Sequence, residues 1–441
     1  MGKPVIWWLR QDLRLTDNPA LVAAAESGAV IPLYILEEPC QIGGASRWWL
    51  HHALAALGAP VVTRRGAVLD VLCEVMRETG ATSVYWNRAY EPTAISRDKN
   101  IKAALKDAGH TAQSFKGNIL IEPWEMPKPY KIFTPFYKAI LGMEAQFGVP
   151  LPAPKNPRWS GATSERLGLL PDIPWDREFL DHWAPGEDGA RARTMDFIDG
   201  AMEDYGHRRD IPGVDGTSRL SPYLHYGEIS ARDLWQTALP HRGAAPFLRE
   251  VAWREFSMHL LFQHPHLPTQ PLQEKFARMP WRKNEKDLRT WQRGMTGFPI
   301  VDAGMRQLWR TGWMHNRVRM IVASFLVKHL LIHWHEGEKW FWDTLVDADL
   351  ANNAASWQWV AGCGADAAPY FRVFNPILQG EKFDPKGDYV RAFVPELADV
   401  PDKFIHKPWE SGMTLDYPAP IVDHAAGRGR ALDAFAYIRN S

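Results

Sequence analysis

The stretch VIWWLRQDLRLTDNPAL, residues 5–21, decides the fold of the first part of the chain. Its five leading apolar residues predict a buried strand, and Asn18 followed by Pro19 predicts a helix start, since Asn caps helices and proline is tolerated in a first turn. Similar patterns predict strands at 30–36, 61–63 and 83–86 and helices at 19–26, 48–57, 68–79 and 95–108. Strands and helices that alternate at this pace predict an α/β domain built on a doubly wound parallel sheet.

The rest of the chain changes character twice. Prolines punctuate residues 122–175, which leaves little periodicity beyond a short helix expected at 136–147. After residue 194 one helical pattern follows another, at 247–262, 300–312, 316–331 and 338–345 among others. We therefore expect an α/β domain at 1–125, a long interdomain linker at 126–193 and an all-α domain at 194–441.

Composition and charge narrow the class of protein. Hydrophobic residues make up 46% and charged residues 23% of the 441, which is typical of globular chains and not of disordered ones. The formal net charge is zero, yet residues 241–345 carry 16 Lys and Arg against 9 Asp and Glu. Such a local excess suits a nucleic-acid partner, although a solvated helical surface explains it equally well from charge alone.

The cysteines and apolar runs indicate where the chain resides. Cys40, Cys73 and Cys363 are odd in number and far apart, which argues against a disulfide framework and suits a reducing cytoplasm. Charged residues follow the first apolar run too soon for a signal peptide, and the most apolar run, 321–332, contains Lys328 and His329. We expect a cytoplasmic protein without a membrane span.

Common catalytic motifs are missing from the sequence. GxGxxG does not follow the first strand, and neither GxxxxGK[ST] nor GxSxG occurs. His329 and His333 are four residues apart but lack the carboxylate of HExxH and a third ligand, so no metal site is expected. Asp347 and Asp349, taken alone, are more often helix caps than catalysts.

A series of motifs in the second half carries a stronger signal. Tyr205 precedes GTSRLSPYLHYG (216–227), EVAWREF (250–256), GWMHNRVRM (312–320), DADLANNAASWQW (347–359) and APYFRVFNP (368–376). Each has an ordinary reading by itself, since GTS is a common cap and WRE a common helix fragment. In this order and spacing they resemble the flavin-binding core of the photolyase/cryptochrome family. The residue 5–21 stretch and YPAPIVDH (417–424) resemble its bacterial cyclobutane pyrimidine dimer (CPD) photolyases, so the resemblance covers nearly the whole chain.

The resemblance implies that the all-α domain binds FAD. The turn at 217–221 and Arg254 would hold the diphosphate, and Arg319, paired with Asp347, would lie near the flavin ring. Asn353 falls where the family contacts the flavin nitrogen that is protonated on reduction. The implied cofactor-binding residues are Tyr205, Thr217, Ser218, Arg219, Leu220, Ser221, Arg254, Asn316, Arg319, Asp347, Ala348, Asp349 and Asn353.

The chain contains 21 tryptophans, most of which must be core packing or interface anchors. Trp357, Trp334 and Trp281 lie at the family's spacing for a chain of electron transfer from the flavin to the surface. The resemblance therefore implies that these three relay electrons during photoreduction.

The implied substrate is a dimer flipped out of UV-damaged DNA. Trp253 and Trp359 would stack on it, and Glu250 would hydrogen-bond a thymine carbonyl. Part of the selectivity would come from extrusion itself, because a poorly stacked lesion costs less to extrude than a normal base. Substrate contacts are expected from Arg209, Glu250, Trp253, Arg317, Met320 and Trp359, and catalytic roles for Glu250, Asn316, Met320 and Asn353. Arg282, Lys283 and Arg372 could also grip phosphates.

Two positions discriminate within the family. Photolyases for (6-4) photoproducts carry a His-His pair where His315-Asn316 stands, so the sequence favours cyclobutane dimers. At position 353, Asn is the photolyase choice, whereas plant cryptochromes carry Asp and insect ones Cys. A cryptochrome photoreceptor is the alternative, also disfavoured by the lack of an extended tail after Ser441, and a redox flavoprotein without DNA is a third reading.

The antenna chromophore is less well defined. NRAYEP, residues 87–92, is shared by members with different antennas, so methenyltetrahydrofolate is the first expectation and a deazaflavin the second. The resemblance further implies a monomer.

Overall fold

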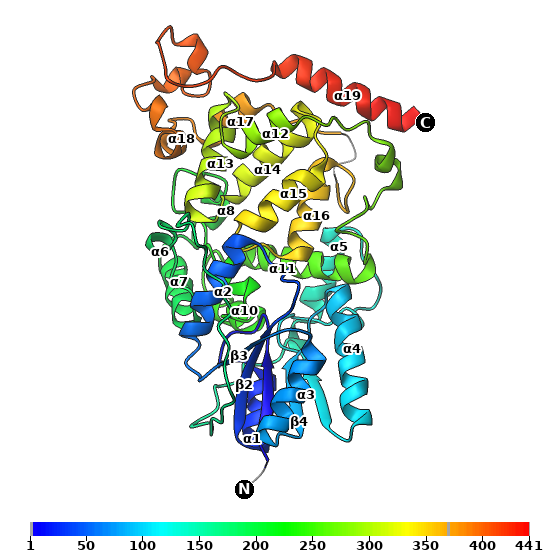
Figure 1. The fold of residues 1–441 in the computed structure, drawn as a ribbon. Helices are drawn as coiled ribbons and strands as arrows, with labels where there is room; N and C mark the ends of the chain where they lie inside the picture. Colours follow the sequence, from blue (N-terminus) through cyan, green and yellow to red (C-terminus); the bar gives the residue numbers. More distant parts are fainter. Residues whose placement is uncertain (1–2, 368–370, 441) are drawn as a thin grey trace. The chain divides into compact units, whose positions relative to one another are not determined.

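The computed structural model describes residues 3–367 and 371–440 (Figure 1). The chain packs into two compact units. Unit 1 comprises Met1–Tyr130, Thr134–Gly200 and Ser218–Pro265, and unit 2 comprises Lys131–Phe133, Ala201–Thr217 and His266–Ser441. This division does not coincide with the boundaries expected at 125 and 193, because residues 134–200 and 218–265 belong to the same unit as the first 130 residues. The expected domain boundaries stay a prediction.

Unit 1 contains one five-stranded sheet in which every pairing is parallel. Its strands are β1 (Val5–Leu9), β2 (Val30–Leu36), β3 (Val62–Arg65), β4 (Ser83–Asn87) and β5 (Thr111–Phe115), in the order β3-β2-β1-β4-β5. The expected parallel sheet is confirmed, and β1 and β2 have the expected bounds. The strand β5 was not expected, since only Ala112 of its five residues is buried and no apolar run marks it.

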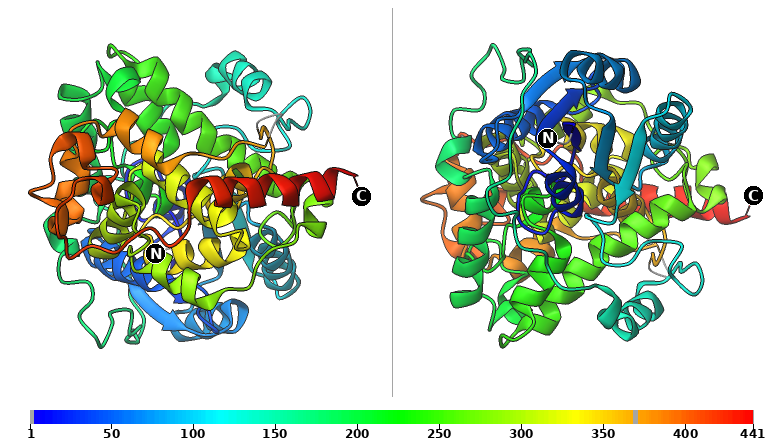
Figure 2. Two further views of the ribbon diagram at one scale, coloured as in Figure 1. Left: turned by 90° about the horizontal axis from the view of Figure 1, so that it is seen from above. Right: turned by 90° about the horizontal axis from the view of Figure 1, so that it is seen from below.

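Helices cover both faces of this sheet. The first four are α1 (Pro19–Ser27), α2 (Gly44–Ala56), α3 (Val68–Thr79) and α4 (Pro92–Asp107). Ile6 and Trp8 form a core with apolar residues of α3 and α4, and the alternate side chains of β1 point to the opposite face, where α1 packs (Figure 2). Asn18 begins α1 as expected, because its side chain accepts a hydrogen bond from the Leu21 amide at 3.1 Å.

Unit 1 continues with helices that the chain adds after the sheet. They are α5 (Phe133–Gly142), whose first residue belongs to unit 2, α6 (Phe179–His182), α7 (Glu187–Asp199), α9 (Ser221–His225), α10 (Ala231–Ala238) and α11 (Ala244–Gln263). The short helix expected at 136–147 is thus α5, shifted towards the N-terminus, followed by a 3₁₀ turn at Glu144–Gln146.

The regular secondary structure of unit 2, in its described residues, is helical apart from an isolated bridge between Arg282 and Ile332. Its helices are α8 (Tyr205–Arg208), α12 (Glu285–Gln292), α13 (Pro299–Thr311), α14 (Asn316–Ser324), α15 (Trp334–Thr344), α16 (Leu350–Ala361), α17 (Pro376–Phe383), α18 (Asp388–Phe393) and α19 (His424–Asn440). The single helix expected at 316–331 was wrong: α14 ends at Ser324 and a π-helix follows at Phe325–His329. Leu331 then takes a positive φ of 52°, which ends the helical run.

None of the helices in the described part of the chain has the combination of length and apolar character that crossing a bilayer requires.

A buried carboxyl in unit 1 gives a test of this packing. Glu228 is 1% exposed and accepts hydrogen bonds from the Gly186 amide at 2.7 Å and Trp49 Nε1 at 3.1 Å. Burial raises the pKa of Glu228 to about 8, so the folded protein holds a proton there that the unfolded chain releases above its ordinary pKa. Wild-type stability should therefore fall as the pH rises from about 5 to 8.

Glu228→Gln removes this titration, and we expect the variant to gain stability relative to wild type between pH 5 and pH 8, measured by urea unfolding at both values. Glu187→Gln is the matched control, because hydrogen bonds from Thr16, Leu15 and Arg191 outweigh burial and lower the pKa of Glu187. Its charged form stabilises the fold, so this variant should lose most stability at pH 7 and least in acid. Equal pH dependence of wild type and Glu228→Gln would contradict the assignment.

Candidate flavin and DNA site

The best-formed feature among the predicted site residues is an ion pair in unit 2. Arg319, on α14, donates from both terminal nitrogens to the Asp347 carboxylate at 3.1 and 2.8 Å, and from Nε to the Met314 carbonyl at 2.7 Å. The carboxylate is 3% exposed and the guanidinium side chain 23%. The predicted pairing is confirmed, and it fixes a largely buried positive group on α14.

Helix α16 begins directly after this pair. Asp349 caps it by accepting hydrogen bonds from the Asn352 amide at 2.8 Å and the Asn352 side chain at 2.7 Å. Asn353 lies in the first turn and donates from Nδ2 to the Glu338 carbonyl at 3.1 Å, which fixes its amide, while its Oδ1 accepts no hydrogen bond from a described residue. Ala348, between the two aspartates, is buried. The cap that the sequence indicated for this pair of aspartates is thus made by Asp349.

One turn further along α16, Trp357 is 2% exposed. Its ring lies against Gly337 of α15 so closely that a Cβ there would come within 2.1 Å of the indole. The indole Nε1 is buried without a hydrogen-bond partner among the described residues, which is uncommon for a buried donor. Asn353 and Trp357 therefore present one acceptor and one donor on the same helix.

The other two tryptophans of the expected relay also lie in unit 2. Trp334 begins α15 and is 1% exposed, whereas Trp281 is half-buried in the segment before α12. The ring of His333 contacts both of them, at centroid distances of 5.2 Å to Trp281 and 5.5 Å to Trp334. No sequence pattern pointed to His333 beyond its spacing from His329.

The predicted substrate residues of unit 2 differ in exposure and in the contacts that they already make, since Met320 Sδ accepts a hydrogen bond from Arg317 at 3.7 Å. Asn316 is exposed and Met320 half-buried on α14. Arg317 is ion-paired with Asp210 at 2.9 Å and lies 4.5 Å from the Phe383 ring, so a phosphate would compete with these contacts. Arg209 lies 5.3 Å from the ring of Tyr205, the predicted cofactor residue that begins α8.

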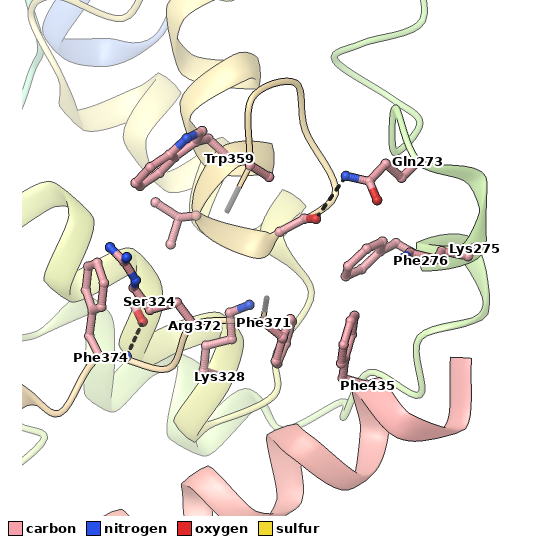
Figure 3. Close-up of a pocket in the computed structure, with 13 residues that line it drawn as sticks. Gln273, Lys275, Phe276, Ser324, Lys328, Trp359, Phe371, Arg372, Phe374 and Phe435 are labelled. Atoms are coloured by element: carbon pink, nitrogen blue, oxygen red, sulfur yellow. Dashed lines mark hydrogen bonds between the residues drawn. The ribbon is translucent and has the colours of Figure 1, made fainter. Parts of the chain in front are cut away.

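A pocket opens in unit 2 beside Trp359 (Figure 3). Phe371 and Phe435 stack in it with centroids 4.6 Å apart, and Lys275 and Arg372 add positive charge. Trp359 itself is oriented by a hydrogen bond from Nε1 to the Asp366 carbonyl at 3.1 Å. The described lining residues include no carboxylate, so the pocket suits an anionic partner that has planar groups.

Lys328 also lines this pocket and was not predicted as a site residue. It is 1% exposed, donates to the Ala361 carbonyl at 2.8 Å and lies 3.1 Å from the Phe371 ring centroid. Burial lowers the pKa of Lys328 well below its ordinary value. The sequence feature that could have identified Lys328 as a site residue is its position inside the most apolar run, 321–332. Three residues of the motif at 368–376, Ala368, Pro369 and Tyr370, lie outside the described residues.

Unit 1 holds the rest of the predicted residues. Ser218 to Leu220 form a turn in which Arg219 has a φ of 51°, and Ser221 begins α9, so the predicted turn does precede a helix. Thr217 lies in unit 2, next to this turn in the chain. On α11, Glu250 and Trp253 are half-buried and three residues apart, hence on one face.

Arg254 is occupied within unit 1. Its guanidinium donates to the carbonyl of Asn118 at 3.2 Å and of Leu224 at 3.4 Å, and it is ion-paired with Glu255 at 3.2 Å. Glu255 is fully buried, and burial raises its pKa to about 7. A diphosphate contact for Arg254 stays a prediction. Such a contact would be made beside these hydrogen bonds or would replace some of them.

The usual ligand crevice of the sheet is filled. In open α/β sheets, ligands bind where the strand order reverses, which here is between β1 and β4. Asn87, at the end of β4, donates to the Asp12 carboxylate at 2.7 Å and to Asn18 Oδ1 at 2.8 Å, and all three residues are buried. The NRAYEP segment thus begins with a structural residue, so an antenna would have to use other groups.

Comparisons with known proteins were consistent with this site. Residues 5–155 match the family described as DNA photolyase, and residues 247–437 match the FAD binding domain of DNA photolyase. The deoxyribodipyrimidine photo-lyase of Agrobacterium fabrum is 50% identical, over 99% of this chain and 98% of the relative. That of Escherichia coli is 40% identical over 98% of both chains, and cryptochrome-2 of Arabidopsis thaliana is 37% identical over 100% of this chain and 80% of the relative.

Solved structures of photolyases are also similar to this chain. The crystal structure of a bacterial class III photolyase from Agrobacterium tumefaciens has a TM-score of 0.96 at 50% identity and covers 100% of this chain and 98% of its own. An archaeal photolyase from Sulfolobus tokodaii, solved with two FAD molecules, has a TM-score of 0.87 at 29% identity, covering 98% and 99%. The chain belongs to the photolyase/cryptochrome family. Within that family, bacterial deoxyribodipyrimidine photo-lyases match it from end to end.

Asp347→Asn tests the ion pair. It leaves Arg319 half-buried opposite a neutral amide, so we expect a loss of about 2 kcal/mol in the free energy of unfolding and a lower flavin content of the purified protein. Asp210→Asn is the control, because it breaks a pair of the same type whose carboxylate is 35% exposed, and should cost at most about 1 kcal/mol. Urea unfolding and the ratio of flavin to protein absorbance measure both effects; equal costs would contradict the importance of the Arg319 pair.

Proposed function

We propose that this protein is a light-dependent DNA repair enzyme, a deoxyribodipyrimidine photo-lyase that splits cyclobutane pyrimidine dimers with FAD. The observation that carries the proposal is the buried Asp347 carboxylate fixing Arg319 beside the first turn of α16, where Asn353 offers a free acceptor oxygen. Full-length similarity to bacterial deoxyribodipyrimidine photo-lyases supports it.

The residues present fit a flavin. Asn353 Oδ1 and Trp357 Nε1, one helical turn apart, lack partners among the described residues, and a flavin ring carries both N–H donors and acceptors. Arg319 is a positive group suited to a reduced, anionic ring, and its charge is already compensated by Asp347. The donor set therefore matches the cofactor that the matching family domain binds.

Bound and reduced, FAD supplies one electron to the dimer under blue light and regains it once the ring has opened. The chain's own part is to hold and orient. We assign the flavin ring to Asn316, Arg319 and Asn353, with Asp347, Ala348 and Asp349 as the supporting segment. The remaining predicted contacts, to the diphosphate and its neighbours, come from Tyr205, Thr217, Ser218, Arg219, Leu220, Ser221 and Arg254. Asn353, whose Nδ2 donates to the Glu338 carbonyl, would accept through Oδ1 a hydrogen bond from the ring nitrogen that is protonated on reduction.

Substrate binding is assigned to aromatic and cationic groups. Trp253 and Trp359 would stack on the extruded dimer. The free-energy cost of extruding it is least for a lesion that is already poorly stacked in the duplex. Glu250 would hydrogen-bond a thymine carbonyl, and Met320 would complete the apolar wall. Phosphate contacts would come from Arg209, Arg317, Arg282, Lys283 and Arg372 and make binding salt-dependent. The cationic aromatic pocket beside Trp359 suits nucleotides next to the lesion.

Several finer points belong to the same proposal. Asn316 after His315, in place of a His-His pair, favours cyclobutane dimers over (6-4) photoproducts, and Asn353 favours repair over cryptochrome signalling. Trp357, Trp334 and Trp281 would relay electrons for photoreduction. The antenna would be methenyltetrahydrofolate or, failing that, a deazaflavin, and the protein would act as a cytoplasmic monomer.

The decisive experiment is repair of a dimer-containing oligothymidine by anaerobically reduced protein, followed through the recovery of thymine absorbance. Recovery in blue light and none in darkness would establish the enzyme class and the lesion. Protein that carries fully reduced flavin and gives no recovery in light would be a cryptochrome or a repair enzyme for another lesion.

Glu250→Ala should lower the repair yield several-fold while the flavin content stays that of wild type, because the side chain is assigned to the dimer and not to the cofactor. Quantum yield on the oligothymidine and the flavin absorbance ratio measure the two effects. Loss of flavin in this variant would assign Glu250 to the cofactor site instead.

Trp281→Phe should slow photoreduction of the oxidised flavin and leave repair by chemically reduced protein intact, because the relay is needed only to load electrons. Flavin absorbance during illumination with a thiol present reports the first, and the oligothymidine assay the second. Repair lost from the pre-reduced variant would show that Trp281 does more than carry electrons.

A further inference from the structure

His333 lies between two of the three tryptophans assigned to the relay. Its ring is tilted at 65° to that of Trp281 and stacks at 26° on that of Trp334, with the centroid distances of 5.2 and 5.5 Å given above. Within the described residues, His333 is the only aromatic ring placed against Trp281. The His333 imidazole therefore offers a path of two ring contacts between the half-buried Trp281 and the buried Trp334.

The same side chain has a second, separable task. His333 is the N-cap of α15, and its Nδ1 accepts a hydrogen bond from the His335 amide at 3.1 Å. Accepting at Nδ1 fixes the neutral tautomer that carries its proton on Nε2. The cap thus locks both the orientation of the ring and its protonation state.

The surroundings also keep the ring uncharged. Burial, together with His335 and Lys339, lowers the pKa of His333 to about 4. Of the other ionisable groups near it, Lys339 lies 3.8 Å from Glu336, and His335 lies 3.8 Å from Glu338 and bonds the Pro268 carbonyl at 2.8 Å. A neutral bridge adds no positive charge beside a tryptophan that must itself become a cation, so it does not oppose the transfer.

We propose that His333 is a positioning residue for electron transfer, a neutral aromatic bridge that couples Trp281 to Trp334. The proposal rests on the proposed function, in which these tryptophans reduce the photoexcited oxidised flavin. One electron passes from Trp281 to the oxidised Trp334, which is restored. Trp281 is left as a cation radical, releases its indole N–H proton to water and is later reduced by an external thiol.

The physical reason is the dependence of electron tunnelling on the medium between donor and acceptor. An aromatic ring whose centroid lies 5.2 and 5.5 Å from those of the two indoles couples them better than a short side chain and the water that would replace the ring. The bridge also holds the half-buried Trp281 at a fixed distance from α15.

Two substitutions separate the bridge from the cap. His333→Asn keeps a side-chain acceptor, and Asn is a good N-cap, but the ring is lost. His333→Phe keeps a ring of similar size and loses the acceptor. In protein with oxidised flavin, flash-induced absorption of the tryptophan radicals reports the transfer, and the unfolding temperature of the same protein reports the cap.

We expect His333→Asn to slow the appearance of the Trp281 radical several-fold at an unchanged unfolding temperature. His333→Phe should lower the unfolding temperature and retain the transfer rate. The proposal is overturned if His333→Asn transfers at the wild-type rate, or if only His333→Phe is slow. If the wild-type protein forms no more radical at Trp281 than Trp281→Phe does, the relay itself is overturned. This outcome differs from failure of the bridge alone, because wild type and all His333 variants would then give the same signal. Dimer repair by the chemically reduced wild type tests the enzyme activity independently of both outcomes.

Discussion

The arrangement of the helical unit depends on how it neutralises one charge, that of Arg319. A guanidinium that is less than a quarter exposed needs a partner, because an unpaired charge in that environment costs several kcal/mol. Asp347 supplies it with two parallel hydrogen bonds and so ties α14 to the segment that starts α16. Two residues later Asp349 caps that helix, and Asn353 and Trp357 follow on successive turns. One ion pair thus holds Arg319 next to the helix that carries Asn353, two of the residues assigned to the flavin ring.

Close packing between α15 and α16 fixes the positions of Trp357 and Asn353 further. Gly337 lets α15 approach the Trp357 ring to a distance that no side chain would allow, and the carbonyl of the next residue, Glu338, orients Asn353. In unit 1, buried polar groups are already partnered with one another. Asp12, Asn18 and Asn87 hydrogen-bond one another where open α/β sheets commonly bind ligands. A sheet of this topology therefore says little about where chemistry occurs, and the site must be argued from side chains.

Tryptophan illustrates why type alone does not reveal a role. Trp7, Trp8, Trp48, Trp49, Trp86, Trp235, Trp291 and Trp334 are all nearly fully buried. Four of these donate an indole hydrogen bond, Trp49 to Glu228 among them, whereas Trp334 has the same burial and a ring contact to His333 that the others lack. What distinguishes a candidate electron carrier is the sequence of rings that continues from it towards the surface.

The sequence by itself determined the features that depend on neighbours along the chain. Apolar runs predicted β1 and β2 with their bounds, side-chain caps predicted the start of α1, and the family resemblance of the motifs implied the Arg319–Asp347 pair. Only the tertiary structure decided the rest. The edge strand β5 is polar and exists because β4 pairs with it, and the π-helix at Phe325–His329 occurs where every residue is buried and Lys328 reaches the Ala361 carbonyl. His333 meets Trp281 across 52 positions of chain. Periodicity and capping are local, whereas these features arise from contacts between segments that the sequence does not place side by side.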